Sequence, residues 1–355
     1  MKMAGLKTCK TCGVPLRVGK GHVWNSDGTI TQRRDPDHRM LFFDSDSLDS
    51  LFSNIEKLIG VPIEKIVIES KARATRTYIS HMIRGAKGQI ARIVGLERIV
   101  TRVVEQGKVM GYGDIKVLEF NWKENYMECE IGNPYSLALF CGDLRGANEA
   151  IRIVVGTVTY EEIGPDRYLI KNFEAPHAPE LEDRLLPTAK PRKPGNIEFN
   201  RCPGCGAPLE ISRFKWDLER GIITHDDTGM RMALFGPTGL EVIFEELERE
   251  LGDTIPDAIV EAQRMHAERS MRPRWKVAQP QDIRNWLAIQ GLGNLAELEP
   301  VGESGFTVRI ENPALPLIIV GTAKGFYEFM TDRKGSVSWE LTDDGDLKMS
   351  FAPAG

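Results

Sequence analysis

The feature that most constrains the fold of this chain is a short cysteine motif that occurs twice. The stretch at 9–16 reads CKTCGVPL, and the stretch at 202–209, which lies 193 residues later, reads CPGCGAPL. We call these two stretches the first and second cysteine knuckle. Beyond them, Trp24 matches Trp216 at a spacing of 192. A match that continues past the motif indicates an internal duplication, which predicts two copies of one fold.

The match between the two copies extends to the last third of each. Asn133-Pro134 matches Asn312-Pro313 at a spacing of 179, and the glycines that follow keep this spacing. The shorter spacing places a deletion in the middle of the second copy. Between the copies, prolines are spread among charged residues, a composition typical of a stiff, exposed linker. We therefore divide the chain into a first repeat at 1–173, a linker at 174–200 and a second repeat at 201–355.

Each repeat predicts a mixture of helices and antiparallel strands. A turn signal at Asp27-Gly28 predicts a strand pair after the first knuckle. Apolar residues at helical spacing predict an amphipathic helix at 48–59 and its counterpart at 240–251. Further helices are predicted at 89–106 and 281–290 and at 137–154 and 317–333, with strand pairs on either side of the last two. We expect an α+β fold: two tandem repeats related by a pseudo-two-fold axis, each an antiparallel sheet with packed helices.

The cysteine knuckles predict a metal site that the two repeats share. A Cys-x-x-Cys-Gly turn presents two thiolates to one ion, whereas a tetrahedral metal needs four ligands. His22, His38 and His225 do not occupy equivalent repeat positions, which disfavours a separate site in each repeat. We therefore predict one structural site that joins the repeats, with zinc as the metal and with the ligands Cys9, Cys12, Cys202 and Cys205.

Two alternatives for the knuckles stay open at this stage. Paired motifs of this kind also resemble the knuckles of rubredoxin, so iron is a second candidate metal. Two independent redox pairs, or thiols without metal, are the other alternative. A redox pair usually lies at a helix N-terminus, which lowers the thiolate pKa, and we expect a strand to follow each knuckle instead. Cys129 and Cys141 have no cysteine counterparts in the second repeat and are predicted to be buried.

Two equivalent acids, Glu69 and Glu261, lie inside apolar stretches and are the candidate catalytic residues. Apolar surroundings raise the pKa of a carboxyl group, which would suit acid or base catalysis. They would then belong to an enzyme that acts on an aromatic or CoA-linked substrate. The alternative, which we favour, is a structural ion pair with an arginine such as Arg39 or Arg231.

The distribution of charged residues favours some classes of binding partner over others. The segment 71–102 carries eight Lys and Arg residues and one Glu, which suits a protein partner, a phosphate-bearing ligand or simply a solvated helix face. Few aromatic residues interrupt it, so nucleic acid is the weakest of these interpretations. The net charge of -5 argues against a general nucleic-acid or membrane binder, and no apolar run approaches the roughly 20 residues of a membrane span.

The cysteine content and the first residues indicate in which compartment of the cell we expect the protein. Four of the six cysteines lie in the knuckles, which fits metal binding in a reducing compartment better than a disulfide framework. The first residues have no apolar core of the kind found in signal peptides. We therefore expect a cytoplasmic protein.

The segment 113–171 resembles the ligand-binding domain that is named after 4-vinyl reductase. The resemblance lies in the Asn133-Pro134 turn, the Gly142-xxx-Gly146 helix and the strand that follows, and the second repeat has equivalents of each. It implies an α+β fold around an apolar pocket that binds hydrocarbons, tetrapyrrole-like molecules or acyl chains. The cysteine-bearing ending common in that family is absent, so a role for those cysteines is not implied.

The resemblance implies a non-catalytic protein that binds, senses or carries a small apolar ligand, which is aromatic, hydrocarbon or acyl. Closely spaced glycines allow a ligand or another element to approach a helix, and aromatic residues could line a pocket or belong to the core. The candidate ligand-binding residues are Gly142, Gly146, Gly321, Gly325, Phe326 and Phe329. The alternatives are the enzyme considered above and an assembly subunit that binds only another protein.

Overall fold

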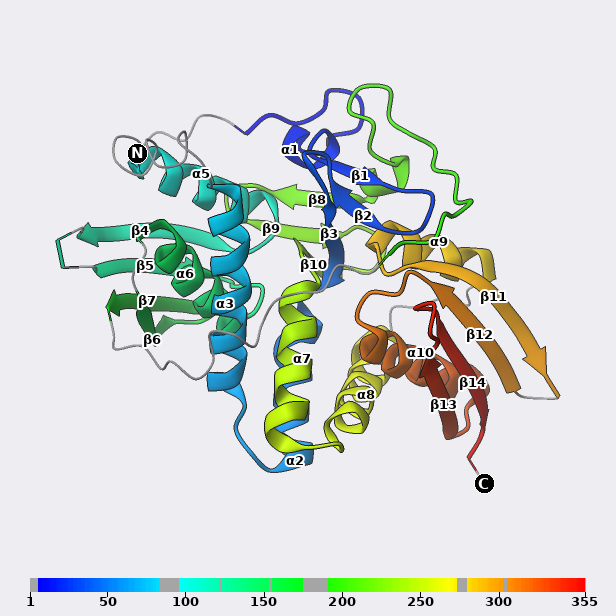
Figure 1. The fold of residues 1–355 in the computed structure, drawn as a ribbon. Helices are drawn as coiled ribbons and strands as arrows, with labels where there is room; N and C mark the ends of the chain where they lie inside the picture. Colours follow the sequence, from blue (N-terminus) through cyan, green and yellow to red (C-terminus); the bar gives the residue numbers. More distant parts are fainter. Residues whose placement is uncertain are drawn as a thin grey trace.

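A computed structural model describes residues 6–83, 96–121, 123–124, 126–152, 155–174, 191–272, 280–302 and 305–354. We call residues 6–174 the first half and residues 191–354 the second half. Helices and antiparallel strands alternate along both halves (Figure 1). This arrangement confirms the predicted α+β class.

A central sheet contains strands from both halves. Its strand order is β1-β2-β3-β10-β9-β8. The strands are β1 (His22–Trp24), β2 (Ile30–Gln32), β3 (Asp35–Asp44), β8 (Phe214–Asp217), β9 (Ile222–His225) and β10 (Arg231–Phe235). The halves meet where β3 pairs with β10, with Phe42 opposite Leu234. Because one sheet spans the boundary between the halves, its hydrogen bonds hold them together.

Each half also has a four-stranded sheet of its own. In the first half it has the order β4-β5-β7-β6 and in the second half the order β11-β12-β14-β13, so the strands follow one another in the same way. The strands are β4 (Asp114–Asn121), β5 (Tyr126–Gly132), β6 (Gly156–Gly164), β7 (Arg167–Glu174), β11 (Asn294–Val301), β12 (Gly305–Glu311), β13 (Gly335–Leu341) and β14 (Leu347–Pro353). The sequence predicted these strand pairs and the helix between them in the C-terminal part of each repeat.

The helices pack in pairs, both within and across the halves. The first half has α1 (Leu16–Gly19), α2 (Asp46–Ile59), α3 (Glu64–Met82), α5 (Leu96–Val109) and α6 (Leu137–Arg152). The second has α7 (Thr238–Leu251), α8 (Ile255–His266), α9 (Pro280–Gln290) and α10 (Pro316–Thr331), together with a 3-10 turn (Leu209–Arg213) and a π-helical turn (Ala267–Met271). Helix α3 packs on α6 and α8 on α10, while α2 packs on α8 and α3 on α7. The helix predicted at 89–106 begins among residues outside the described ones.

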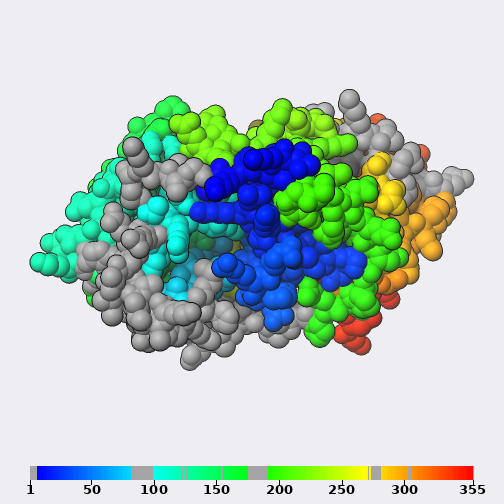
Figure 2. Space-filling model, turned by 90° about the horizontal axis from the view of Figure 1, so that it is seen from above, coloured from blue at the N-terminus to red at the C-terminus, as the bar shows by residue number. Residues whose placement is uncertain are grey.

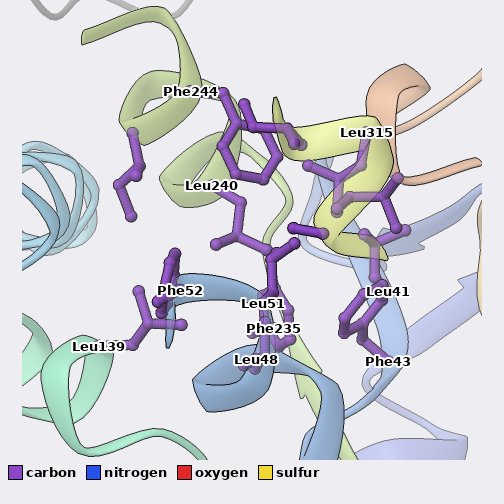
Figure 3. Close-up of a cluster of buried hydrophobic side chains, with 14 of the residues drawn as sticks. Leu41, Phe43, Leu48, Leu51, Phe52, Leu139, Phe235, Leu240, Phe244 and Leu315 are labelled. Atoms are coloured by element: carbon purple, nitrogen blue, oxygen red, sulfur yellow. The ribbon is translucent and has the colours of Figure 1, made fainter. Parts of the chain in front are cut away.

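The largest apolar core lies between these helices and the central sheet. Helix α2 contributes Leu48, Leu51 and Phe52, all of which were predicted to form its buried stripe. Leu240 and Phe244 of α7 point toward them from the second half (Figure 3). Fully burying such a side chain contributes about 1.5–3 kcal/mol. Either half without the other would expose this shared core to water.

The loops of each half contact the other half at equivalent places. The indole N–H of Trp24 donates to the carbonyl oxygen of Ile289 at 3.0 Å, and that of Trp216 donates to the carbonyl oxygen of Val109 at 3.1 Å. The backbone N–H of Gly293 donates to Gly28, and that of Gly113 donates to Gly221. Each strand pair that follows a knuckle therefore docks on the four-stranded-sheet region of the opposite half.

Two arginines reinforce these cross-half contacts. The Arg39 guanidinium donates to the carbonyl oxygens of Gly291 and Asn312, at 3.1 and 2.9 Å. The Arg231 guanidinium donates to the carbonyl oxygens of Asn133 and Pro134. Glu69 and Glu261 form their ion pairs with other residues, so the prediction that Arg39 and Arg231 would pair with them was wrong. Their guanidinium groups instead satisfy backbone carbonyls that the turns after β5 and β12 leave without a strand partner.

The described part of the predicted linker, residues 191–200, is mostly exposed but is held to the rest of the chain by hydrogen bonds. Ile197 is buried, and its N–H donates to the carbonyl oxygen of Ser26. The N–H of Lys193 donates to the side chain of Asn312, 2.8 Å away. Residues 191–200 therefore lie against the first strand pair, beside β1 and β2 (Figure 1). Prolines keep this segment extended, and its hydrogen bonds hold it in place.

Candidate metal centre

The two cysteine knuckles form the same turn. In the first, the N–H of Cys9 donates to Val14 and the N–H of Gly13 donates to Cys9. In the second, Cys202 and Gly206 make the corresponding bonds, to Ala207 and Cys202. Gly13 and Gly206 have φ of 78° and 81°, a left-handed conformation that glycine adopts without strain. The CxxCG pattern thus forms, in each half, a turn that directs two sulfur atoms to one side.

The structure brings the four knuckle cysteines together. The Sγ atoms of Cys9 and Cys202 are 3.7 Å apart, and those of Cys12 and Cys205 are 3.5 Å apart. All four Sγ atoms lie within 4.8 Å of one another. A tetrahedral metal with bonds of about 2.3 Å to sulfur requires sulfur atoms about 3.8 Å apart. The four cysteines therefore lie close enough to hold one metal ion, with two ligands from each half.

The face of the molecule that carries the site shows why the ligands are far apart in sequence. The first knuckle, drawn in blue, and the segment around the second knuckle, drawn in green, lie side by side (Figure 2). A second apolar core surrounds the knuckles and contains side chains of both halves, among them Trp24, Phe42 and Phe214. The four-cysteine cluster therefore lies on the boundary between the halves rather than inside either one.

Backbone N–H groups point at the sulfur atoms and shift their pKa values. The N–H groups of Cys12 and Thr11 lower the pKa of Cys9 to about 6. Burial alone would raise the pKa of Cys202, but the N–H groups of Gly204 and Cys205 lower it below its ordinary value. One thiol of each knuckle therefore favours the anionic form that binds a metal.

The second cysteine of each knuckle behaves differently. Burial raises the pKa of Cys12 and of Cys205 above the ordinary value of a thiol. Buried thiolates are costly unless a cation compensates their charge. A divalent ion between the four sulfur atoms would supply that compensation, so the electrostatics of the site fit a metal.

Backbone packs closely on two of the four sulfur atoms, while Cys12 is half-buried. A Cβ atom at Gly19 would lie 2.8 Å from Sγ of Cys205, and one at Gly204 would lie 2.8 Å from Sγ of Cys9. Backbone thus packs directly against the sulfur atoms. Four protein ligands leave no coordination position for a reacting molecule, which is the property of a structural site.

One expectation about the knuckles was wrong. A strand was predicted directly after each knuckle, but the short helix α1 follows the first and the 3-10 turn Leu209–Arg213 follows the second. Both begin after the CxxC residues, so neither places a cysteine at a helix N-terminus. All six cysteines are free thiols, and Cys129 and Cys141 are buried in the large core, as predicted.

The candidate catalytic acids lie in ion pairs. Each is held by two cations: Glu69 by Arg73 and Arg145, and Glu261 by Arg264 and Lys324. Burial alone would raise the pKa of both carboxyl groups, but these cations lower it below the ordinary value of glutamate. An acid or base catalyst at neutral pH needs a raised pKa. The structural ion pair that we favoured describes both residues, although with other partners than Arg39 and Arg231.

The four candidate ligand-binding glycines lie where helices cross. A Cβ atom at Gly142 would lie 2.8 Å from the carbonyl oxygen of Ile68, and one at Gly146 would lie 2.1 Å from that of Ala72. In the second half, Gly321 and Gly325 contact α8 and the turn that follows it in the same way. These glycines let α6 approach α3 and α10 approach α8, so helix packing accounts for the spacing that suggested a pocket.

The candidate aromatic residues contact one another. The rings of Phe326 and Phe329 are 4.9 Å apart between centroids and are tilted by 67°, and Phe326 also meets the ring of Trp286. All three are half-buried. Edge-to-face contacts of this kind stabilise a core, so the described contacts of Phe326 and Phe329 are those of packing residues.

The basic segment 71–102 is largely engaged within the first half where it is described. Lys71 pairs with Asp143 at 3.2 Å, and Arg73 pairs with Glu69 at 2.9 Å. Residues 84–95 lie outside the described part of the chain. Lys71 and Arg73, in the middle of α3, thus serve contacts within the fold.

One polar cluster was not predicted from the sequence. His266 of α8 lies between Asp44 of β3 and Ser50 of α2, with 3.0 Å from a ring nitrogen to each. Asp44 and His266 are buried, and the cluster again joins the two halves. His266 is more than 200 residues from both partners in the chain and shares no motif with them, so only the fold identifies the cluster.

Comparison with known proteins gives no match. No family model, no curated protein and no solved structure matches this chain. Among the described residues, no helix has both the length and the apolar character needed to cross a membrane.

Proposed function

We propose that this protein is a non-catalytic binding scaffold in which one zinc ion holds two homologous halves together. The observation that carries the proposal is the four-cysteine cluster, to which each half contributes two ligands. Metal binding to such a site contributes directly to folding, because the ligands are not assembled in the unfolded chain. The ion would stabilise the boundary between the halves.

Several contacts support a duplication with a two-fold relation between the halves. Trp24 and Trp216 bind the opposite half through the same indole N–H, and Arg39 and Arg231 do so through the same guanidinium contacts. The two four-stranded sheets have the same strand order. Equal sequence motifs that make equal contacts on opposite halves are what a duplicated chain would produce.

The acid–base alternative has less support. The lowered pKa values of Glu69 and Glu261 keep both carboxylates ionised, and each is already held by two cations. A binding role is therefore the better proposal. A small apolar ligand, as the resemblance implies, stays a prediction, and such a ligand would have to bind away from the helix crossings at Gly142 and Gly321.

Metal analysis of the purified protein tests the proposal. We expect one zinc per chain, and the absence of the visible absorption of an iron–thiolate centre. Replacing either pair of knuckle cysteines by serine should remove the metal entirely, because two thiolates do not complete a tetrahedral site. Cys141→Val is the matched control, since Cys141 aligns with Val320, and it should retain the metal. A chain that keeps half of its metal after loss of one knuckle would contradict a shared site.

A further inference from the structure

The first turns of α2 and α7 occupy matching positions in the two halves but have different surroundings. Residues 44–47 correspond to residues 236–239 at a spacing of 192. The first N–H groups of a helix have no partner within the helix and need an acceptor from elsewhere. What surrounds each first turn therefore indicates what can bind there.

The chain itself supplies an anion at the first turn of α2. One carboxylate oxygen of Asp44 accepts from the backbone N–H of Asp46 at 3.0 Å. The other oxygen lies 3.0 Å from Nε2 of His266. A negative charge is favourable at this place, because the N-terminus of a helix carries a partial positive charge.

The first turn of α7 has no such anion among the described residues. Gly236 occupies the position of Asp44, and Ala74 of α3 occupies the position of His266. The N–H of Thr238, at the matched position in α7, has no acceptor in the described part of the chain. Both the carboxylate and the imidazole that complete the turn in the first half are thus replaced by residues without polar side chains.

A buried lysine faces this turn of α7. The stem of Lys71 packs on Gly142 where α3 crosses α6, and its ammonium group extends to Gly239, whose Cβ position is 3.1 Å from Nζ. Lys71 exposes only 7% of its surface. Apart from the carboxylate of Asp143, 3.2 Å away, the ammonium group has no described partner, so two of its three N–H donors remain. A cation beside a helix N-terminus is unfavourable unless an anion binds to both.

The charge around Lys71 favours one type of anion. Asp143 already accepts from the hydroxyl groups of Thr75 and Tyr135, at 2.6 Å each. Together with Lys71 it carries no net charge, so only the partial charge of the helix, about half an elementary charge, is left to balance a ligand. This favours a carboxylate, with one negative charge, over a phosphate, which carries up to two. A carboxylate is also the group that Asp44 supplies at the matched turn.

Aromatic rings lie next to the turn and the lysine. The rings of His38 and Tyr78 are stacked with centroids 4.2 Å apart, and Nε2 of His38 lies 3.3 Å from the Cβ position of Gly236. Tyr112 is stacked on Tyr135 at 4.4 Å. The second half has none of these rings at the matched positions, which hold Met230, Ser270, Leu292 and Ala314. Because His38 and Tyr78 are only half-buried, a flat ring can reach them.

We propose that the first turn of α7 and the ammonium group of Lys71 bind the carboxylate of a small aromatic acid. The carboxylate would accept from the N–H of Thr238 and from Lys71, and the ring of the ligand would lie against Tyr78 and His38. This site is separate from the cysteine cluster, so the inference goes beyond the scaffold proposed above.

The test uses the intact, metal-loaded chain and sodium benzoate, with binding measured by isothermal titration calorimetry. We expect one benzoate to bind per chain and neutral benzamide not to bind. Lys71→Met should weaken benzoate binding by about tenfold or more, because it removes a charge-assisted hydrogen bond. Lys65→Met, at an exposed lysine of the same helix, is the matched control and should leave binding unchanged.

A second pair of variants leaves the buried lysine in place. Gly236→Asp introduces a carboxylate at the position of Asp44, which should occupy the first turn of α7 and abolish benzoate binding. Gly236→Ala adds the Cβ atom without the charge and should retain binding. Circular dichroism shows whether each variant is folded.

Equal benzoate affinity of the wild type and of folded Lys71→Met or Gly236→Asp would overturn the inference, as would no binding to the wild type. Tighter binding of inorganic phosphate than of benzoate would overturn the assignment to a carboxylate. Zinc is measured on the same samples. Loss of benzoate binding with one zinc still present removes only this inference, whereas absence of zinc removes the proposed scaffold itself.

Discussion

Strands β1 and β8 both end the central sheet, yet Trp24 of β1 is fully buried and Trp216 of β8 is half-buried. A second difference lies where α3 crosses α6 and α8 crosses α10. In the first half, Asp143 accepts from Lys71 and from the hydroxyl groups of Thr75 and Tyr135. The equivalent crossing in the second half has a neutral bond from Gln263 to Thr322. The halves thus keep the contacts that join them and differ in what lies at their edges and crossings.

This comparison separates two kinds of residue. The knuckles, the two tryptophans and the two arginines make matching contacts, so their loss should have similar effects in either half. The charged pair at the α3–α6 crossing is replaced by a neutral pair at the α8–α10 crossing, so loss of a partner should have unequal effects there. Measurements on paired variants therefore test whether matching residues have equal effects in the two halves.

The largest effect should follow loss of a knuckle. Replacing Cys9 and Cys12 by serine, or Cys202 and Cys205 by serine, should lower the melting temperature by roughly 10 °C or more, because structural zinc contributes several kcal/mol to folding. The two double variants should be equally unstable when measured by calorimetry. A large difference between them would mean that the two knuckles do not share one ion.

The helix crossings should respond unequally. Asp143→Asn should cost about 3 kcal/mol, because it leaves the ammonium group of Lys71 buried without its counter-charge. Removal of the neutral partner in the second half, by Thr322→Val, should cost only about 1 kcal/mol. Denaturant unfolding measures both. Equal costs would show that the charge at the first crossing has no energetic consequence.

The cross-half arginines should respond alike. Arg39→Ala and Arg231→Ala should each cost about 2 kcal/mol, since each leaves buried carbonyl oxygens without donors. Arg213→Ala is the control, because Arg213 forms only an exposed ion pair with Asp227, and its loss should be close to neutral. The same denaturant measurement applies. An effect in only one of the two arginine variants would contradict the matched contacts.

The smallest effect concerns the two glutamates and pH. The pKa of Glu69 and of Glu261 is lower in the folded than in the unfolded chain, so their ionised forms stabilise the fold above the unfolded value of about 4.5. This stability is lost as pH falls through the folded pKa. Glu69→Gln should therefore destabilise the protein by about 1 kcal/mol at pH 7 and have little effect at about pH 3. Glu261→Gln should act in the same direction but less, because Glu261 is more exposed. An effect that grows at low pH would contradict the assigned ion pairs.

The sequence predicted the features that depend on local pattern or on the internal match. Apolar spacing predicted α2, and the CxxCG turns predicted a cluster of four sulfur atoms, because glycine at Gly13 and Gly206 is specific for that turn. The match between copies identified Trp24 and Trp216 as equivalents. It did not tell which half each tryptophan would contact, since that depends on how the strand pairs dock.

The same limit applies where a pattern suits two structures. The Gly142 and Gly146 spacing suits either a pocket or a helix crossing, and the structure places α3 close to both glycines. No local sequence pattern places Arg39 or Arg231 beside an acid. Their partners are backbone carbonyl oxygens of the opposite half, which come within reach only when the two halves dock.

X-ray absorption at the metal edge of the intact protein tests the central claim most directly. The account predicts four sulfur ligands at about 2.3 Å, because two cysteines from each half complete one tetrahedral site. A shell of two sulfur atoms completed by nitrogen or oxygen would contradict it. Such a shell would mean that each knuckle binds its own ion and that no metal joins the halves.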